Sequence, residues 1–423
     1  MTGRRIRLSL LFVVALATLA LLAGPSPAEA ARAGKAGAGK GKAGPKSACI
    51  DCHRKVTPGV VRQFLAGRMA KEMDCAGCHG SGHTSGGDAA KAKLPTPDTC
   101  AGCHEDRVGQ YRKGKHALAW AAMNALPLTT HQPLALVGGE GLKGCSGCHK
   151  IGEKPPAAIT RYGGGACDAC HTRHTFSVKE ARDPRACRTC HMGFDHPQWE
   201  MWQTSKHGTI WEIEPGSGRA PACQKCHMPG GDHGVMTAWG FLALRLPEED
   251  NDWRRDRITI LQALGVLDRK GNPTERLEAV KTARIARLTR EEFDALRKKM
   301  SAVCAECHSA RYAADALAAG DRLIRESDRI LADSIRTVKA LYDDGILVKP
   351  ADWKYAPDLL QFYEAKSTAE QELYLMFMEY RTRTFEGAFH ANPDYTHWYG
   401  WAKLKEASER IREDAARLRR ETR

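Results

Sequence analysis

The sequence has no cysteine outside one short repeated motif. All 16 cysteines of the 423-residue chain fall in C-x-x-C-H segments, so eight such motifs use every thiol. None remains for a disulfide, a separate zinc site or a catalytic thiol. After residue 30 the chain also lacks an apolar run long enough to cross a bilayer, and strand signals are few.

The eight motifs predict eight covalently attached c-type haems. In this motif two thiols form thioethers with the porphyrin vinyl groups, and the adjacent histidine is held over the iron as its proximal ligand. A lone motif could be a zinc half-site or a redox dithiol, but neither accounts for so many copies. The attachment cysteines are Cys49, Cys52, Cys75, Cys78, Cys100, Cys103, Cys145, Cys148, Cys167, Cys170, Cys187, Cys190, Cys223, Cys226, Cys304 and Cys307. The proximal histidines are His53, His79, His104, His149, His171, His191, His227 and His308.

Histidines outside the motifs can supply the second axial ligands. Of 17 histidines, nine lie outside the motifs. A protein with two histidines on every iron would use eight of these nine, and a protein with one open, reactive haem would use seven. The histidine count permits both coordination patterns. The candidate distal ligands are His83, His116, His131, His174, His207, His233, His390 and His397, and the ninth spare histidine is His196.

The first 48 residues predict export and a flexible lead-in. Residues 1–30 combine arginines near the start, an apolar stretch and an Ala28-Glu29-Ala30 cleavage site, which is the form of a secretory signal peptide. We expect a mature chain in the periplasm or otherwise outside the cytoplasm, with no transmembrane segment. Residues 31–48 are mostly Gly, Ala and Lys and predict a flexible basic linker.

The charge balance is strongly basic, with a formal net charge of +14. In another protein, this net charge would suggest binding to nucleic acid or to an anionic surface. Here the haem propionates need cationic partners, and these account for much of the excess. We therefore expect no nucleic-acid partner, and some of the cations could steer a small anionic substrate such as nitrite.

Composition divides the mature chain near residue 240. Residues 49–240 hold seven motifs joined by Gly- and Pro-rich segments, and residues 241–423 hold one motif in a charged, helix-forming sequence. We predict a mostly α fold. The first part would be a seven-haem domain in which haems replace an apolar protein core, with irregular loops and short helices near 56–70, 108–123 and 198–207. The second part would be a bundle of long helices.

A heptad spacing marks the first long helix of that bundle. Leu317, Ile324, Leu331 and Val338 recur every seven residues, and residues 343–345 would end the helix. Further helices are predicted over 357–389 and from Pro393 to about residue 420. The apolar seam fits packing inside one chain as well as packing between subunits.

Motif order and two segments resemble the hydroxylamine oxidoreductase family. The fourth motif stands apart from a close fifth and sixth pair, followed by CHMGFDHPQWEMW at 190–202 and PDYTHWYGW at 393–401. The resemblance covers essentially the mature chain, which is short for that family. It implies a haem-dependent oxidoreductase that acts on hydroxylamine, nitric oxide or nitrite. Seven haems would carry electrons, and the haem of Cys145, Cys148 and His149 would be the reactive one.

The resemblance also implies particular catalytic residues. An Asp–His pair on the open face of the reactive haem corresponds here to Asp195 and His196, which would relay protons to and from the substrate. Alternatively, His196 is a distal ligand and Asp195 holds its other ring nitrogen. Oxidising members cross-link a tyrosine from a neighbouring subunit to the catalytic porphyrin. Tyr395 is the candidate, with Tyr399 second, and simple aromatic packing is the alternative.

Two other functions remain open. The first is a reductive nitrite or hydroxylamine reductase without the tyrosine cross-link, which the short chain favours slightly. The second is an electron-transfer conduit in which every haem is six-coordinate. The resemblance further implies a homo-oligomer, specifically a trimer, and a small redox partner such as a cytochrome c or a quinone-linked cytochrome.

Overall fold

The computed structural model describes residues 47–125, 143–193, 196–237, 251–277, 289–351, 353–361 and 365–422. The predicted signal peptide, nearly all of the predicted linker, and the candidate residues His131 and Asp195 lie outside these ranges. Residues Cys49–Arg423 form one compact unit. The boundaries at residues 30 and 240 stay predictions.

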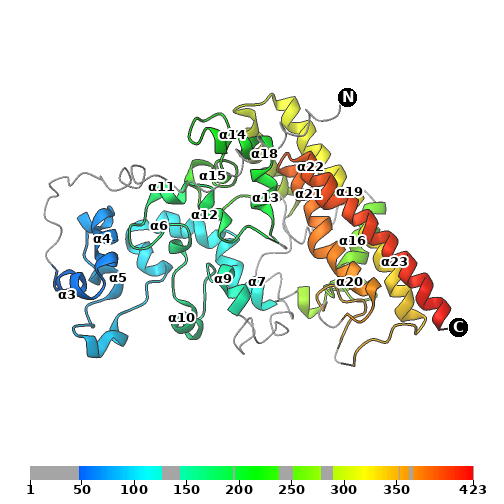
Figure 1. Ribbon diagram of the computed structural model, residues 1–423, viewed down its shortest axis with the longest axis horizontal. Coiled ribbons are helices and arrows are strands. Elements are labelled where there is room, and N and C mark those ends of the chain that lie inside the picture. Colours follow the sequence, from blue (N-terminus) through cyan, green and yellow to red (C-terminus); the bar gives the residue numbers. More distant parts are fainter. Residues whose placement is uncertain are drawn as a thin grey trace, which may run out of the picture. The chain divides into compact units, whose positions relative to one another are not determined.

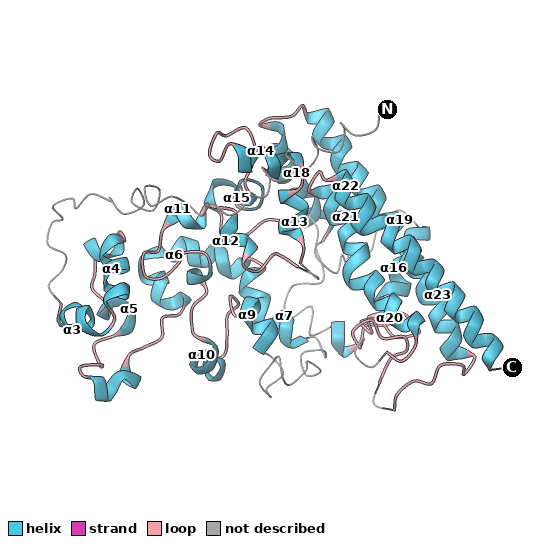
Figure 2. Ribbon diagram, in the orientation of Figure 1, coloured by secondary structure: helices cyan, strands magenta, loops and turns pink. Residues whose placement is uncertain are grey.

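The described residues form helices and loops, with one isolated β-bridge between Leu267 and Pro273, so the mostly α prediction is confirmed (Figures 1 and 2). In the motif-rich part the α-helices are α3 (Ala48–Val56), α4 (Pro58–Ala66), α5 (Ala76–His79), α6 (Pro97–Lys113), α7 (Ala119–Ala125), α9 (Lys143–His149), α10 (Pro156–Tyr162), α11 (Val178–Ala181), α12 (Arg185–Arg188), α13 (Gln198–Gln203), α14 (Lys206–Ile213) and α15 (Cys223–His227). Single 3-10 turns lie at η1 (Met69–Lys71), η2 (Gly86–Lys91), η3 (His116–Leu118), η5 (Cys167–Ala169) and η6 (Pro229–Gly231).

The helices after residue 250 include much longer ones. They are α16 (Asn251–Ala263), α18 (Arg290–Ala305), α19 (Ala310–Asp343), α20 (Thr368–Leu375), α21 (Arg381–Phe389), α22 (Pro393–Tyr395) and α23 (Ala402–Glu421). Two π-helical segments, η8 (Met376–Tyr380) and η9 (Thr396–Trp401), join α20 to α21 and α22 to α23. The predicted helix from Pro393 to about residue 420 is thus confirmed.

Local signals set the ends of the long helices. The Ser309 hydroxyl caps α19 by accepting from the Tyr312 amide, and Gly345 with φ 70° follows its end, as predicted. The helix predicted over 357–389 begins only at Thr368, because Ser367 and Glu370 form a capping box there. The prediction was therefore wrong for the described residues between 357 and 367, which are not helical.

The heptad seam of α19 packs inside this chain. Ile324, Leu331 and Val338 are fully buried. The last two belong to a large apolar core with residues of α16, α20 and α23, such as Ile260, Leu373 and Leu404. Of the two arrangements that the spacing permits, packing within one chain is the one observed.

A buried ion cluster lies in the same bundle. Asp328 of α19 is fully buried, and its carboxylate accepts from Arg381 Nε (2.6 Å), Arg257 Nη1 (3.1 Å) and Trp253 Nε1 (2.8 Å). These donors come from α21 and α16, so three helices meet at one carboxylate. Burial opposes ionisation of Asp328, but Arg381 and Arg257 outweigh it and hold its pKa below the ordinary value.

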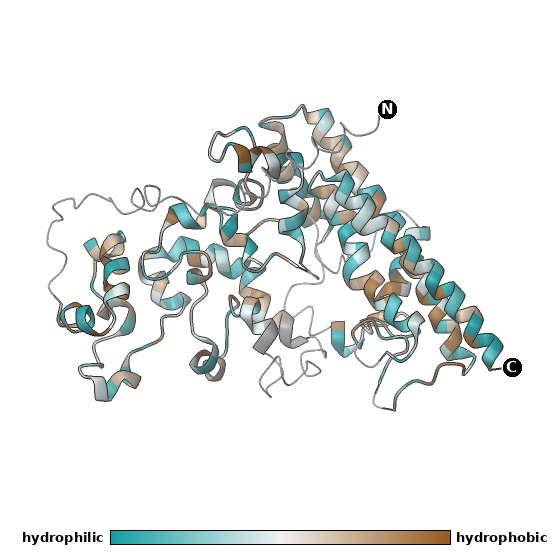
Figure 3. Ribbon diagram, viewed as in Figure 1, coloured by the Kyte–Doolittle hydropathy of each residue, from teal (hydrophilic) through white to brown (hydrophobic). Residues whose placement is uncertain are grey.

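Apolar protein core is scarce in the motif-rich part. Its described clusters are small, one of Ile50, Val61, Phe64 and Ala70 and another of Tyr111, Ala117 and Ala166. Figure 3 shows hydrophobic and hydrophilic residues mixed along these short helices. Among the described helices, none combines the length and apolar character that a membrane span requires.

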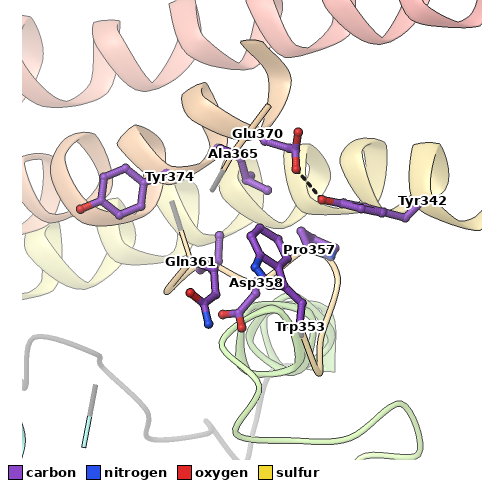
Figure 4. Close-up of a pocket in the computed structure, with 10 residues that line it drawn as sticks. Tyr342, Trp353, Pro357, Asp358, Gln361, Ala365, Glu370 and Tyr374 are labelled. Carbon is purple, nitrogen blue, oxygen red and sulfur yellow. Dashed lines mark hydrogen bonds between the residues drawn. The ribbon is translucent and has the colours of Figure 1, made fainter. Parts of the chain in front are cut away.

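The bundle also contains a small pocket, which Figure 4 shows in close-up. Its lining includes Tyr342 and Glu370, which are hydrogen-bonded to each other, together with Trp353, Asp358 and Gln361. No residue of a C-x-x-C-H motif lines it. The candidate functional site lies elsewhere, at the paired histidines.

Candidate haem sites

Six proximal histidines each face a second histidine at a nearly constant separation. A metal–imidazole bond of about 2.0 Å, with the ring centre about 1.1 Å behind the nitrogen, puts the centres of two axial imidazoles about 6.2 Å apart. The observed ring-centre separations match this value. They are His53–His83 6.0 Å, His79–His174 6.3 Å, His171–His233 6.2 Å, His191–His116 6.1 Å, His227–His390 6.3 Å and His308–His207 6.0 Å. The residues present therefore fit haem irons held between two histidines.

The ring hydrogen bonds leave the correct nitrogen for an iron. Eight histidines of the described chain use Nδ1 for a protein contact, which leaves Nε2 for the metal. With Nε2 as ligand, Nδ1 carries the proton and donates. The acceptors are Thr57 Oγ1 for His53, Lys93 O for His79, Asp88 Oδ1 for His83, Ala119 O for His149, Gln198 Oε1 for His191, Met236 O for His227, Gly231 O for His233 and Glu386 O for His390.

The attachment thiols show which motifs are neighbours at the start of the series. Burial and then the nearby Cys49 raise the pKa of Cys75. Burial, Cys100 and Cys103 raise the pKa of Cys78. The side chain of Cys100 lies next to that of Cys167. The first, second, third and fifth motifs therefore lie in succession.

The series continues through the remaining motifs. Burial, Cys187 and Cys190 raise the pKa of Cys170, and the side chain of Cys187 lies next to that of Cys223. Burial and then Cys304 raise the pKa of Cys226 to about 11. The spatial order is thus first, second, third, fifth, sixth, seventh and eighth, with the fourth motif outside this line.

The fourth motif lies beside the sixth. Cys148 Sγ is 3.9 Å from Thr189 O, within the sixth motif. His149 donates from Nδ1 to Ala119 O (2.8 Å), and the ring of His196 lies 6.2 Å from the ring of His149, at an interplanar angle of 74°. The structure thus brings together the two described residues that sequence assigned to the reactive haem. Asp195 lies outside the described residues.

His196 sits between two haem positions. Its ring centre is 6.4 Å from that of His191, the proximal ligand of the sixth motif. Its 6.2 Å separation from His149 falls within the range of the six pairs above, so His196 also has the reach of an axial ligand. Both roles proposed from sequence therefore agree with its position.

The bundle holds the loop that carries His196. Gln198 N donates to His196 O (2.9 Å), and Gln198 Nε2 donates to Glu386 Oε2 (2.7 Å). The side-chain oxygen Oε1 of Gln198 accepts from His191 Nδ1 (3.3 Å), and the backbone oxygen of Glu386 accepts from His390 Nδ1 (2.8 Å). Sequence reasoning missed both residues. The spacing of His191 and Gln198 was the only local signal, since Glu386 comes from a distant helix.

Glu386 is a carboxylic acid in a strongly desolvated position. Burial raises its pKa to about 7, although the hydrogen bond from Gln198 and the nearby His196 oppose this rise. Lys115, which is close to Glu386, has a pKa lowered by burial. Glu386 therefore has both His196 and Lys115 as near neighbours.

Asn392 fixes the other end of α13. Its side-chain amide, buried at 3% exposure, donates to Met201 O (2.9 Å) and Thr204 Oγ1 (2.7 Å). Its side-chain oxygen Oδ1 accepts from the backbone amide of Tyr395 (2.9 Å). One side chain therefore connects the helix after His196 with the segment that carries Tyr395.

The other predicted site residues have distinct surroundings. Tyr395 is 7% exposed and stacks on Tyr399, which is 53% exposed, with ring centres 4.9 Å apart. His397 is exposed and its ring stacks on Trp401 at 5.7 Å. The ring of His104 has no facing histidine among the residues that the structure describes, and the candidate His131 lies outside them.

These features define a multihaem c-type cytochrome in which helices and loops hold a series of histidine-ligated irons. The chain belongs to the family described as "Seven times multi-haem cytochrome CxxCH", whose model matches residues 45–237 and 276–352.

A curated relative is the "Probable nitrite reductase-hydroxylamine oxidoreductase fusion protein" of Kuenenia stuttgartiensis. It is 26% identical, over 88% of this chain and 51% of the relative. The chain therefore spans about half the length of this relative. The resemblance to the hydroxylamine oxidoreductase family is confirmed at the level of the multihaem family and this relative.

Two solved structures share the fold. One is a reducing HAO-like protein complex of Kuenenia stuttgartiensis, with a TM-score of 0.66 and 24% identity, covering 88% of this chain and 85% of that chain. The other is a "Hypothetical multiheme protein", with a TM-score of 0.61 and 21% identity, covering 88% of this chain and 95% of that chain.

Proposed function

We propose that the chain is an octahaem oxidoreductase acting on small nitrogen compounds such as hydroxylamine, nitric oxide or nitrite. The reaction site would be at the haem of Cys145, Cys148 and His149. The observation that carries this proposal is the position of His196, whose ring lies 6.2 Å from His149 beside the sixth motif. The similarity to a relative named for nitrite and hydroxylamine chemistry supports the substrate class.

The haem, when bound, supplies the iron at which the substrate nitrogen exchanges electrons. The chain's own groups handle protons and geometry. His196 transfers protons to or from the substrate, because changes at an N–O bond move protons together with electrons. Asp195 orients His196, and Gln198 holds its backbone in place through Glu386.

The other seven haems would carry electrons to and from this site. The sixth motif is the first step, since Thr189 lies against Cys148 and His191 lies close to His196. The other six motifs of the series extend the path in both directions from there. Such a series suits chemistry in which several electrons move without release of reactive intermediates.

The remaining elements of the proposal come from the resemblance and the leader sequence. The protein would be exported to the periplasm or another extracytoplasmic compartment, and would form a homotrimer. It would exchange electrons with a small cytochrome c or quinone-linked cytochrome. Tyr395 would be the residue cross-linked to the catalytic porphyrin in an oxidising enzyme, and a reductive enzyme would lack this link.

A second candidate function is an electron-transfer conduit with every iron six-coordinate. The favouring observation is that the His149–His196 separation falls in the range of the six facing pairs. In this case His196 would be a ligand, and no position would be open to substrate.

Ligand binding separates the two functions. Purified holoprotein is mixed in turn with cyanide, hydroxylamine and nitrite while its absorption and electron paramagnetic resonance (EPR) spectra are recorded. The oxidoreductase predicts that one haem responds and that the others stay low-spin. If no haem responds, the conduit is correct and the oxidoreductase proposal fails.

A further inference from the structure

One of the eight Nδ1 hydrogen bonds described above ends on a carboxylate. Of the eight Nδ1 hydrogen bonds above, seven end on a hydroxyl, an amide carbonyl or a backbone carbonyl. The eighth joins His83 to Asp88 Oδ1 at 2.9 Å. His83 faces His53, so this carboxylate acts on the haem of the first motif.

The surroundings keep the Asp88 carboxylate in place and negatively charged. It accepts from Ser85 N (2.8 Å), Thr84 N (3.0 Å) and Thr84 Oγ1 (3.1 Å). Its side chain is 16% exposed and that of His83 is 25% exposed. A partly buried anion with several donors affects its hydrogen-bond partner more strongly than a fully solvated one.

The first motif is also one end of the spatial series. Its neighbour in that series is the second motif, through Cys49 and Cys75. The helices that carry this motif and follow it have exposed apolar side chains, since Val56 and Val60 are 65% and 36% exposed. An external redox protein can therefore approach this haem.

A carboxylate on the far nitrogen changes the redox balance of a ligated iron. It increases the basicity of the imidazole, which stabilises the ferric form over the ferrous form and lowers the midpoint potential. Electrons pass spontaneously from a low-potential haem to neighbours of higher potential. A low-potential haem at an exposed end is suited to receive electrons and pass them inward.

We propose that Asp88 makes the His53–His83 haem the low-potential, electron-accepting end of the series. The inference rests on the proposed function and deepens it, because it assigns the reductive direction to electron flow. In the entry step a reduced low-potential cytochrome loses one electron and the ferric iron between His53 and His83 gains it. No bond forms or breaks in this step.

The test is a potentiometric titration of holoprotein followed by EPR and absorption. Asp88→Asn keeps the shape and the acceptor oxygen but removes the charge. We expect one haem to shift to a more positive midpoint potential while its low-spin signal remains. In the parent protein, the midpoint potential of this haem should lie in the lower half of the values measured for all haems. Thr57→Val is the matched control, since it removes a neutral contact on His53, the opposite ligand of the same iron, and should cause a smaller shift.

Each remaining outcome decides the proposal. Unchanged potentials in Asp88→Asn, or a shift confined to a haem in the upper half, would overturn it. If Asp88→Asn loses the axial ligand, Asp88→Glu decides, because this variant retains the charge and must keep the parent potential. No substrate is used, so an absence of nitrogen-compound turnover would refute the proposed function without affecting this result.

Discussion

Gln198 and Glu386 form a direct hydrogen bond of 2.7 Å between the start of helix α13, which follows the loop that carries His196, and helix α21 of the bundle. The same glutamine accepts from His191, and the same glutamate accepts from His390 through its backbone. Gln198, through its side chain, and Glu386, through its backbone oxygen, thus connect ligands of the sixth and seventh motifs to the candidate reaction site. The bundle is part of the site's framework.

Removing this connection should impair turnover without loss of cofactor. We expect Gln198→Ala to reduce turnover roughly tenfold or more, the usual scale for losing a group that orients a metal ligand. Gln203→Ala is the matched control on the same helix, because Gln203 bonds the exposed Glu212. Steady-state assays with haem quantification make the comparison, and equal activities in both variants would contradict a positioning role.

The two proposed roles of His196 predict different spectra. As a proton-transfer group, His196→Ala should lower turnover by roughly a hundredfold and leave the haem spin states unchanged. All eight haems should stay attached, since the motifs are intact. Spin-state measurement on the variant is decisive. A new high-spin haem would show that His196 was a ligand.

Two candidate distal histidines provide a matched pair. His390 faces His227 at 6.3 Å, whereas His397 stacks on Trp401. We expect His390→Ala to convert one low-spin haem to high spin and His397→Ala to change none. EPR spectra of the two variants test this, and a high-spin signal in His397→Ala would assign it to an iron.

The Asp328 cluster should contribute strongly to the stability of the bundle. Asp328→Ala leaves Arg257 and Arg381 buried without their shared counter-ion, which should cost about 3–5 kcal/mol of unfolding free energy. Asp333→Ala is the control on the same helix. Its side chain is 42% exposed and pairs with Arg336, so the loss should stay below about 1 kcal/mol. Denaturant unfolding of the two variants measures the difference.

The pH dependence of that contribution has a definite sign. Because the pKa of Asp328 is lowered in the folded chain, its stabilisation is complete above the unfolded value of about 3.9. The stabilisation is lost as the pH falls through the lower folded value. As the pH falls below about 3.9, the parent should therefore lose stability more steeply than Asp328→Asn, and parallel profiles would contradict this.

The number of attached haems can be measured directly. Mass spectrometry of the mature, denatured polypeptide should show eight haem additions, because every cysteine belongs to a motif. Removal of one attachment pair, in Cys304→Ala with Cys307→Ala, should lower the count by one. A parent mass with fewer than eight additions on fully matured material would contradict the octahaem prediction.

Sequence predicted the parts of this protein that depend on local signals. The heptads of Ile324, Leu331 and Val338 predicted the long α19 helix, and the C-x-x-C-H spacing predicts the attachment residues. The start of α20 was missed, because the Ser367 and Glu370 capping box is a weaker signal than the helix-forming composition around it.

Relations between distant segments could not be predicted in the same way. Which spare histidine faces which proximal one depends on tertiary folding, as His116 with His191 and His390 with His227 show. Glu386 has no motif of its own, and its contact with Gln198 spans 188 positions of sequence. Such residues are identified only once the helices are assembled.

The scarcity of apolar protein core around the first seven motifs has a consequence for biogenesis. With clusters as small as that of Tyr111, Ala117 and Ala166, this region has little to drive collapse before its cofactors are installed. The bundle core around Leu331 and Leu373 needs no such help. We expect newly made polypeptide to be cleaved by proteases in residues 49–237 until the haems are attached, while residues 310–421 resist. Maturation would thus proceed from covalent attachment to folding, and cells short of haem should accumulate C-terminal fragments.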